Sequence, residues 1–366
     1  MKGRRSSFSC LFVIAMSAAT ACGGRALESG QSGSDGATVA PPDGRCALTP
    51  TLLVSASTYP VPASTSSVKV GAGGLVVNGA DLYYVTYSIA TGSRSMPYLA
   101  GAVLRIPAAG GAPTEIASGY DFGLPVFTAT TLILERNNAW PNTDADDVVS
   151  IPLSGGSPTA LVTFDANEVL ISDPVTDGTF LYLATSEGAR AVPLASPANE
   201  ISLTTEAPND VLPLGGHLVM TFAQGAVKSV PLPPASGDVV TLAVGLPPGP
   251  SNLAPCGTSA CWLAGSTIEQ INPARGPATA AVAGAAPFSG IRGFVVDGDT
   301  FFVVAASTSD NMPDTIASIP AAGGDAVVLV KTRDAGSIAV DDECVYWSNA
   351  DGIFSVAKTA RGPFDQ

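Results

Sequence analysis

The chain of 366 residues carries 17 Lys and Arg against 31 Asp and Glu, a formal net charge of −14, and one histidine. This acidic balance argues against binding to nucleic acid or to anionic lipid headgroups, which both need a basic surface. A single histidine gives little support to His-based nucleophilic triads or His-rich metal centres. With 39 glycines, 30 prolines and many short apolar runs, the composition is typical of an all-β fold.

The first 22 residues have the layout of a secretory signal. A basic start at residues 2–5 and an apolar stretch at residues 8–18 lead through the small residues 19–21 to Cys22. The apolar stretch is too short to span a bilayer. The segment resembles a bacterial lipoprotein signal, although Ala19 stands where that family usually has Leu, and the resemblance implies lipidation of Cys22. We therefore expect an exported protein that meets the membrane only through a lipid anchor; ordinary signal cleavage nearby is the alternative.

Residues 23–45 consist mainly of Gly, Ser, Ala and Pro, with almost no large apolar side chains. Such a segment cannot bury a core, so we predict a flexible tether. One pattern then repeats to the end of the chain, and we predict that residues 46–366 form a single domain.

The repeat is recognised by an apolar strand that ends in proline followed by a small or apolar residue. The markers are Pro107, Pro152, Pro193, Pro231, Pro273 and Pro320, with Ala357 in the seventh place. Their spacing of 37 to 47 residues suits four strands per unit. Turns such as Asn78-Gly79 and Asp297-Gly298, which favour two-residue hairpins, connect the first two strands of their units. The pattern predicts an all-β, seven-bladed β-propeller of four-stranded antiparallel blades.

The seventh unit lacks its fourth strand, because little of the chain remains after Thr359. Residues 50–57, PTLLVSAS, match the fourth-strand pattern and precede the first unit. We therefore expect this N-terminal strand to complete the last blade, which closes the ring and removes exposed sheet edges.

Four of the six cysteines follow the leader, and an even number in an exported chain favours disulfides. Three pairings are possible. Cys256 and Cys261 flank one predicted hairpin turn and are the natural local pair. Cys46 precedes the closing strand and Cys344 begins the second strand of the blade that it completes, so a bond between them would hold the ring shut. The spacing does not fit a zinc site.

Three connections between second and third strands are long, at residues 88–100, 137–146 and 307–314. They belong to units one, two and six, which lie in one arc of the closed ring. Rigid scaffolds often carry recognition on such loops, although tolerated surface insertion is the alternative. The candidate partner-binding residues are Tyr87, Met96, Tyr98, Trp140, Asn137, Asn138, Asp310 and Met312.

Acidic and amide residues stand where the units begin, on the same face of the ring. Because first strands line the central channel, these side chains are candidates for a ring of oxygen ligands at its mouth, which suits Ca²⁺. Ordinary turn formation by Asp and Asn is the alternative, and it carries more weight. The candidate ligands are Asp121, Asp165, Asn167, Asp210 and Asp334.

The sequence Val345-Tyr346-Trp347-Ser348-Asn349, followed by residues 352–356, resembles the YWTD-type repeat of low-density-lipoprotein-receptor propellers. Similar units occur in bacterial secreted and lipoprotein propellers, including TolB-like ones. The chain departs from the pattern at Asn349, where the repeat has Asp, and in having seven units rather than six. The resemblance implies a blade, not a ligand, and such propellers mostly act as binding platforms.

Two functions remain open. The first is a monomeric cell-surface or periplasmic lipoprotein that binds a protein, peptide or glycan partner. The second is a propeller enzyme, lactonase- or lyase-like, that uses a metal at the channel mouth. No spacing in the sequence singles out a catalytic residue.

Overall fold

The structure is a computed structural model, and the chain divides into residues 1–39 and residues 40–366. The structure describes residues 46–59, 68–90, 101–137, 146–165, 168–233, 239–247, 249–265, 267–274, 280–281, 288, 290–306, 313–361 and 364–365. The predicted leader, Cys22 and the predicted tether lie outside the described residues and stay predictions.

Regular structure in the described part of the chain is all β, apart from one 3-10 turn, η1 (Ala56–Thr58). The first unit contains β2 (Val68–Asn78), β3 (Asp81–Ala90), β4 (Gly101–Pro107) and β5 (Thr114–Phe122), and the second contains β6 (Val126–Phe127), β7 (Thr131–Asn137), β8 (Asp147–Pro152) and β9 (Thr159–Thr163). The third contains β10 (Val175–Thr176), β11 (Phe180–Thr185), β12 (Gly188–Pro193) and β13 (Ile201–Thr204), and the fourth contains β14 (Asp210–Leu214), β15 (His217–Phe222), β16 (Ala226–Pro231) and β17 (Val240–Ala243).

The remaining units continue the same order. The fifth contains β18 (Ser251–Cys256), β19 (Ser259–Ala264), β20 (Thr267–Ile271) and β21 (Ala280–Ala281), and the sixth contains β22 (Gly290–Asp297), β23 (Thr300–Ala306), β24 (Asp314–Pro320) and β25 (Val327–Thr332). The seventh contains β26 (Ile338–Val340), β27 (Cys344–Asn349), β28 (Gly352–Ala357) and, from the other end of the chain, β1 (Thr51–Ser55), while β29 (Phe364–Asp365) follows last.

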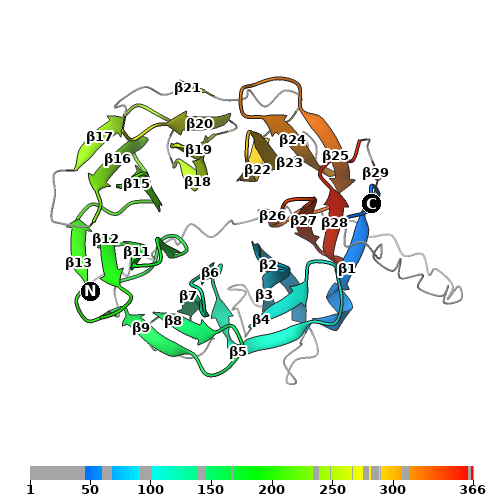
Figure 1. Ribbon diagram of the computed structural model, residues 1–366, viewed down its shortest axis with the longest axis horizontal. Helices are drawn as coiled ribbons and strands as arrows, with labels where there is room; N and C mark the ends of the chain where they lie inside the picture. The colour runs from blue at the N-terminus through cyan, green and yellow to red at the C-terminus, as the bar shows by residue number, and fades with distance from the viewer. Residues whose placement is uncertain are drawn as a thin grey trace, which may run out of the picture. The chain divides into compact units, whose positions relative to one another are not determined.

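Within each unit the strands pair antiparallel in sequence order, and Figure 1 shows the sheets around a central axis with first strands innermost. Asp121 and Phe122 at the end of β5 also pair with Asn137 and Arg136 of β7, so the first two units share one eight-stranded sheet. The all-β class and the four-stranded antiparallel units are therefore confirmed. The number of seven separate blades stays a prediction.

The hydrophobic core is divided into clusters between neighbouring sheets. The described residues form one such cluster at each junction around the ring. Alternate residues of a second strand serve different clusters: Leu181 and Leu183 face the second unit, whereas Tyr182 faces the fourth. Because both faces are covered, these strands are continuous apolar runs rather than alternating ones.

The proline marker has a structural reason at the end of the third strand. Proline cannot donate to the sheet there, but the carbonyls of Pro107, Pro152 and Pro320 each accept a hydrogen bond from a glycine three residues later, at 2.8 Å for Pro107 and Gly110. Gly110 has φ of 89°, a conformation that favours glycine. The Gly-rich turn after the marker is therefore required by backbone geometry.

The ring is closed by the N-terminal strand, as the sequence predicts. β1 forms the outer edge of the seventh unit and pairs antiparallel with β28, with Thr51 opposite Ser355. Gly352 permits this approach, because an added Cβ atom would lie 2.0 Å from the carbonyl oxygen of Val54. Both predicted disulfides, Cys46–Cys344 and Cys256–Cys261, are present.

The two disulfides constrain the unfolded chain to different extents. Cys46–Cys344 spans 298 residues of sequence, whereas Cys256–Cys261 spans 5. Chain entropy alone gives about 6 kcal/mol for a bond of the first kind and about 2 kcal/mol for the second. The bond at the closure therefore contributes more to holding the fold together.

The chain does not end with the third strand of the seventh unit. β29 adds a further strand to the sixth unit and runs parallel to β25, with Phe364 opposite Val330 and Asp365 opposite Lys331. The last residues show no repeat pattern in the sequence, so this strand was not predicted.

We expect deletion of residues 46–57 to unfold or oligomerise the protein, because it bares the edge of β28 and removes the longer disulfide. Val54→Asp tests the same interface more gently, since Val54 is 3% exposed and a carboxylate there has no partner. We expect a loss of about 3 kcal/mol in the free energy of unfolding. The measurements are denaturant unfolding and size-exclusion chromatography.

Leu52→Asp on the same strand is the matched control, because Leu52 is 48% exposed. A truncated protein that stays monomeric and keeps its melting temperature would contradict closure by this strand.

Candidate functional site

The loop face is the end of the ring where second strands pass into third strands. Three of its connections are long, residues 91–100, 138–146 and 307–313. The other four hairpins turn within residues 186–187, 223–225, 265–266 and 350–351. β26 of the seventh unit contacts both β2 and β22, and β5 pairs with β7, so the strand ends that carry the long connections lie in one arc.

Most of the candidate partner-binding residues fall on the loops themselves. Met96, Tyr98, Asn138, Trp140, Asp310 and Met312 lie outside the described residues. Tyr87 is half-buried near the end of β3, where burial raises its pKa. Asn137 is the last residue of β7 and takes part in the cluster described next. Their role in binding a partner stays a prediction.

An acidic cluster, Asp121, Glu135, Asn137, Asp146 and Asp173, lies at the loop face of units two and three. Asp121 is opposite Asn137 across the β5–β7 pair, and Glu135 is two residues earlier on β7. Alternate residues of a strand point to the same side, so Glu135 and Asn137 share a face. With its side-chain amide oriented to satisfy both neighbours, the Asn137 nitrogen donates to Asp146 Oδ1 at 3.2 Å and to Glu135 Oε1 at 3.1 Å.

The backbone N–H groups of Gly123 and Leu124 form hydrogen bonds with residues of the cluster. The Leu124 N–H donates to Asp173 Oδ1 at 2.7 Å, and the Gly123 N–H donates to the Glu135 carbonyl at 3.1 Å. A Cβ atom added to Gly123 would lie 2.8 Å from Asp173 Oδ1 and 3.2 Å from Glu135 Cβ. A glycine is therefore what lets Glu135 and Asp173 approach the same segment.

Arg136, which follows Glu135 on β7, is paired with an acid outside this cluster. Arg136 points to the opposite side of β7, where its guanidinium forms an ion pair with Asp147 and lies 4.7 Å from the centre of the Tyr120 ring. Burial first, and then the charges of Asp173, Asp146 and Asp121, together raise the pKa of Glu135 to about 8. Glu135 is therefore mainly protonated at neutral pH.

The pKa values of Asp121 and Asp173 are raised less than that of Glu135. Burial, followed by the charge of Asp146, raises the pKa of Asp121 to about 6. Burial also raises the pKa of Asp173 to about 6, although the hydrogen bond from Leu124 acts in the opposite direction. At neutral pH the site therefore combines a protonated glutamate, which can donate a hydrogen bond, with ionised aspartates that accept them.

Of the predicted calcium ligands, Asp210 has a structural role that the structure shows directly. It accepts from the Val211 N–H at 2.9 Å and from the Leu253 N–H of the fifth unit at 2.8 Å. Asp314 joins units in the same way, because it accepts from the Ala335 N–H at 3.0 Å. Acceptors at these positions tie neighbouring sheets together.

The remaining predicted ligands are dispersed. Asp165 and Asp334 are exposed, and Asp334 has a left-handed φ of 50° in the turn before β26. Asn167 lies outside the described residues. Among the residues that the structure describes, no group of three or more His, Cys, Asp or Glu side chains could hold a metal ion. Calcium binding stays a prediction.

Glu135 was missed in the sequence, although the repeat carries a signal for it. The units can be aligned on the second-strand residue that lies opposite the marker residue, which is Thr131 opposite Pro152 in unit two. In this alignment, other units have a second-strand residue equivalent to Glu135. In the units where a marker residue has a partner in the second strand, the corresponding residues are Val85, Ala184, Thr221, Val304 and Ser348, and all are buried. Glu135 is thus an acid at a place that otherwise holds an apolar, small or hydroxyl side chain.

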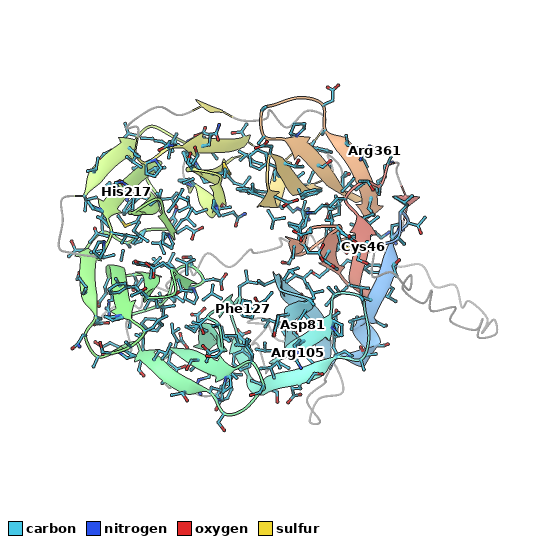
Figure 2. All side chains as sticks on the ribbon, viewed as in Figure 1. Cys46, Asp81, Arg105, Phe127, His217 and Arg361 are labelled. Atoms are coloured by element: carbon cyan, nitrogen blue, oxygen red, sulfur yellow. A yellow bond between two sulfur atoms is a disulfide. The ribbon has the colours of Figure 1, made fainter. Side chains whose placement is uncertain are left out.

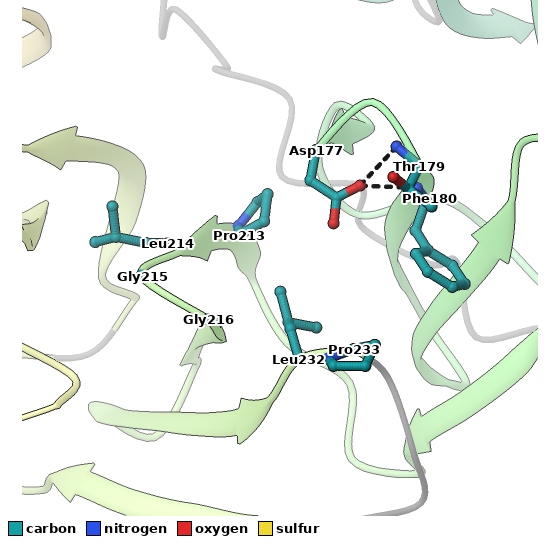
Figure 3. Close-up of a pocket in the computed structure, with 9 residues that line it drawn as sticks. All are labelled: Asp177, Thr179, Phe180, Pro213, Leu214, Gly215, Gly216, Leu232 and Pro233. Carbon is teal, nitrogen blue, oxygen red and sulfur yellow. Dashed lines mark hydrogen bonds between the residues drawn. The ribbon is translucent and has the colours of Figure 1, made fainter.

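The opposite face of the ring has a cavity of about 360 Å³ between units three and four (Figure 3). Its walls include Phe180, Pro213, Leu214 and Leu232. The carboxylate of Asp177 at its edge already accepts two N–H bonds, at 2.8 Å each, and the Tyr182 hydroxyl at 2.7 Å. The Asp177 carboxylate is therefore already hydrogen-bonded within its own hairpin.

We expect Glu135→Gln to stabilise the protein above neutral pH. The pKa of Glu135 is raised from 4.5 to about 8 on folding, so the folded state binds more protons than the unfolded state between these values. Its contribution to stability is full below about pH 4.5 and is lost as the pH rises through about 8. At pH 8.5 the variant should gain on the order of 2 kcal/mol in denaturant unfolding.

The exposed Glu115→Gln on β5 is the matched control and should leave the pH profile unchanged. Asp121 and Asp173 titrate near pH 6 in both proteins, so the difference between the two stability curves reports Glu135 and should grow from about pH 4.5 to about pH 8. Parallel stability curves over that range would contradict the raised pKa of Glu135.

The sequence matches no family model and no curated protein. Among solved structures, the β-propeller domain of the Trilobed protease from Pyrococcus furiosus, described as having an open velcro topology, is similar, with a TM-score of 0.54 and 8% identity over 80% of this chain and 97% of that one. A computationally designed protein, Ika8, has a TM-score of 0.52 and 10% identity over 84% of this chain and 99% of its own.

Puromycin hydrolase has a TM-score of 0.52 and 14% identity over 77% of this chain, which spans 57% of that enzyme. At these identities the similarity concerns the fold alone. The resemblance to YWTD-type repeats and to lipoproteins finds no matching family model. The comparisons and the sheet order together establish an all-β propeller.

Proposed function

We propose that this protein is an exported binding platform whose propeller presents a protein, peptide or glycan partner-binding surface at the loop face. One observation carries the proposal: the three long connections arise from one arc of one face, whereas the other four hairpins turn within two or three residues. Insertions that were only tolerated would have no reason to gather in one arc of the ring. Recognition surfaces on rigid scaffolds are typically built from such loops.

The first unit supports its long connection with longer strands. β2 has 11 residues and β3 has 10, whereas β11, β15 and β27 have 6 each. Paired strands restrict the end points of the loop that they carry, which lowers the entropy lost when a partner binds. This supports a contact surface held in place by the scaffold.

The acidic cluster lies at the base of the same face and supports a particular partner chemistry. Ionised Asp121 and Asp173 favour amino, guanidinium or hydroxyl groups, which can donate hydrogen bonds to them. The net charge of −14 adds a long-range attraction for a basic partner. The alternative function, a metal-dependent lactonase- or lyase-like enzyme, has no such observation in its favour within the described residues.

The two disulfides indicate an oxidising compartment outside the cytosol. Within the described residues, no helix is long and apolar enough to cross a membrane. The lipoprotein-type signal in the sequence supports lipidation of Cys22 and attachment to the cell envelope, with the platform held at the membrane surface through residues 23–45.

We expect radiolabelled palmitate to be incorporated at Cys22 when the full chain is produced in a host with the lipoprotein pathway. The Cys22→Ser variant should be exported without label. An unlabelled soluble product from the unchanged chain would contradict lipidation and indicate ordinary signal cleavage.

We expect Trp140→Ala combined with Tyr98→Ala to weaken binding of the partner recovered by cross-linking from the cell envelope. Truncating an aromatic hot-spot residue typically costs about 2 kcal/mol, roughly a thirtyfold loss of affinity. Stability should change little, because exposed loop tips contribute little to the core. Affinity is measured by calorimetry and stability by thermal unfolding.

Glu187→Ala is the matched control, since Glu187 is an exposed residue of a tight connection on the same face. Two results would overturn the proposal. One is unchanged affinity in the double variant, and the other is a large loss of stability, which would identify the two aromatics as packing residues.

A further inference from the structure

The outer edge of the sixth unit differs from the others. The sheets of units two, three, four, five and seven end at β9, β13, β17, β21 and β1. In the sixth unit β25 is followed by β29, and this is the one parallel pair among the described strands. Because β29 lies outside the up-and-down order of the repeat, it has been added to the edge from elsewhere in the chain, as Figure 1 shows at the outside of the ring.

β25 is a strong template for strand addition. Its sequence, VVLVKT, has four consecutive Val and Leu residues, whereas the outer strands β13 and β17 read ISLT and VTLA. Leu329 and Val330 are fully buried against the sixth and seventh units, which fixes the strand in place. A rigid, β-branched edge presents its unpaired N–H and C=O groups at constant spacing, which is what an added strand needs.

The C-terminal segment reaches this edge from a fixed point. The Ala360 N–H donates to the Ala357 carbonyl at 2.9 Å, and Ala360 is 1% exposed in the same hydrophobic cluster as Leu329 and Val330. Arg361, labelled in Figure 2, follows beside the outer strands of the sixth unit. The short distance along the chain from Ala360 to β29 gives the segment an effective concentration in the millimolar range at β25.

We propose that the outer edge of β25 is a strand-addition site for an extended peptide that runs parallel to β25, and that the chain's own C-terminal residues occupy it. The bound segment shows the chemistry that the site takes: an apolar residue, Phe364, opposite Val330, and an acid, Asp365, opposite Lys331. Main-chain hydrogen bonds supply affinity in this mode, and the residues opposite one another supply selectivity. The site is on the rim and does not depend on the function proposed for the loop face.

Two register pairs make a weak contact, so an incoming peptide with the same pattern can compete for the edge. A partner in solution would be captured when its local concentration exceeds the effective concentration of the tail. β29 thus covers the outer edge of β25 until a matching peptide replaces it. This cover also prevents edge-to-edge association of two copies of the protein.

The test compares the full chain with a variant that ends at Arg361, both with the disulfides intact. The probe is a fluorescein-labelled peptide of residues 361–366, RGPFDQ, and binding is measured by anisotropy into the millimolar range. We expect saturable binding to the truncated protein and binding at least about tenfold weaker to the full chain, because the tail competes. Amide hydrogen exchange at residues 330–332 should be faster in the truncated protein and should slow when the peptide is added.

A charge reversal distinguishes a selective site from a strand edge that binds any extended peptide. In the truncated protein, RGPFDQ should bind about threefold better than RGPFKQ, and Lys331→Glu should reverse this preference to about the same extent, as expected for opposite charges in register. The proposal is overturned by equal binding to full and truncated chains, or by unchanged exchange at residues 330–332. It is equally overturned if self-association is the only effect of truncation, which would assign the edge to a second copy.

Discussion

The structure depends on burying both faces of every sheet, which only a closed ring can do. Each junction between neighbouring units has its own hydrophobic cluster, so a missing strand at one point exposes the cores on both sides of it. Closure depends on β1, which reaches the seventh unit from the other end of the chain, and on the Cys46–Cys344 disulfide beside it. Local hairpins cannot supply this step, because the residues that meet are separated by almost the whole domain.

A closed ring of similar units can tolerate one unit that departs from the pattern. At the place of Glu135 the other second strands have side chains such as Val85, Val304 or Ser348, which fit a dry junction. A carboxyl group there is unfavourable when ionised, and the fold accommodates it with Asn137, with the close approach at Gly123 and by holding the proton on Glu135. The loss of stability from this carboxyl group is confined to one junction at the loop face, where the long connections also begin.

Much of the fold could be predicted from the sequence, because its signals are local to one unit. The proline marker, the Gly-rich turn after it and the continuous apolar second strand each follow from one hairpin, and they recur often enough to reveal the period. The closing strand could be predicted because one unit was short of a strand. The Cys46–Cys344 disulfide followed from the same argument, since these residues flank strands that had to meet, whereas Cys256–Cys261 was predicted as the local pair of one hairpin.

What the sequence did not reveal depends on contacts between units. The acids where units begin suggested metal ligands, yet Asp210 is directed at the backbone N–H of Leu253 in the next unit, a partner that no spacing within a repeat shows. β29 escaped notice because two residues have no periodicity, and its partner, β25, is a unit away. Glu135 could have been found by comparing equivalent positions of the units rather than counting acids along the loops. In a repeat protein the scaffold is encoded by what the units share, so the residues that break the common pattern are where a specific activity has to be sought.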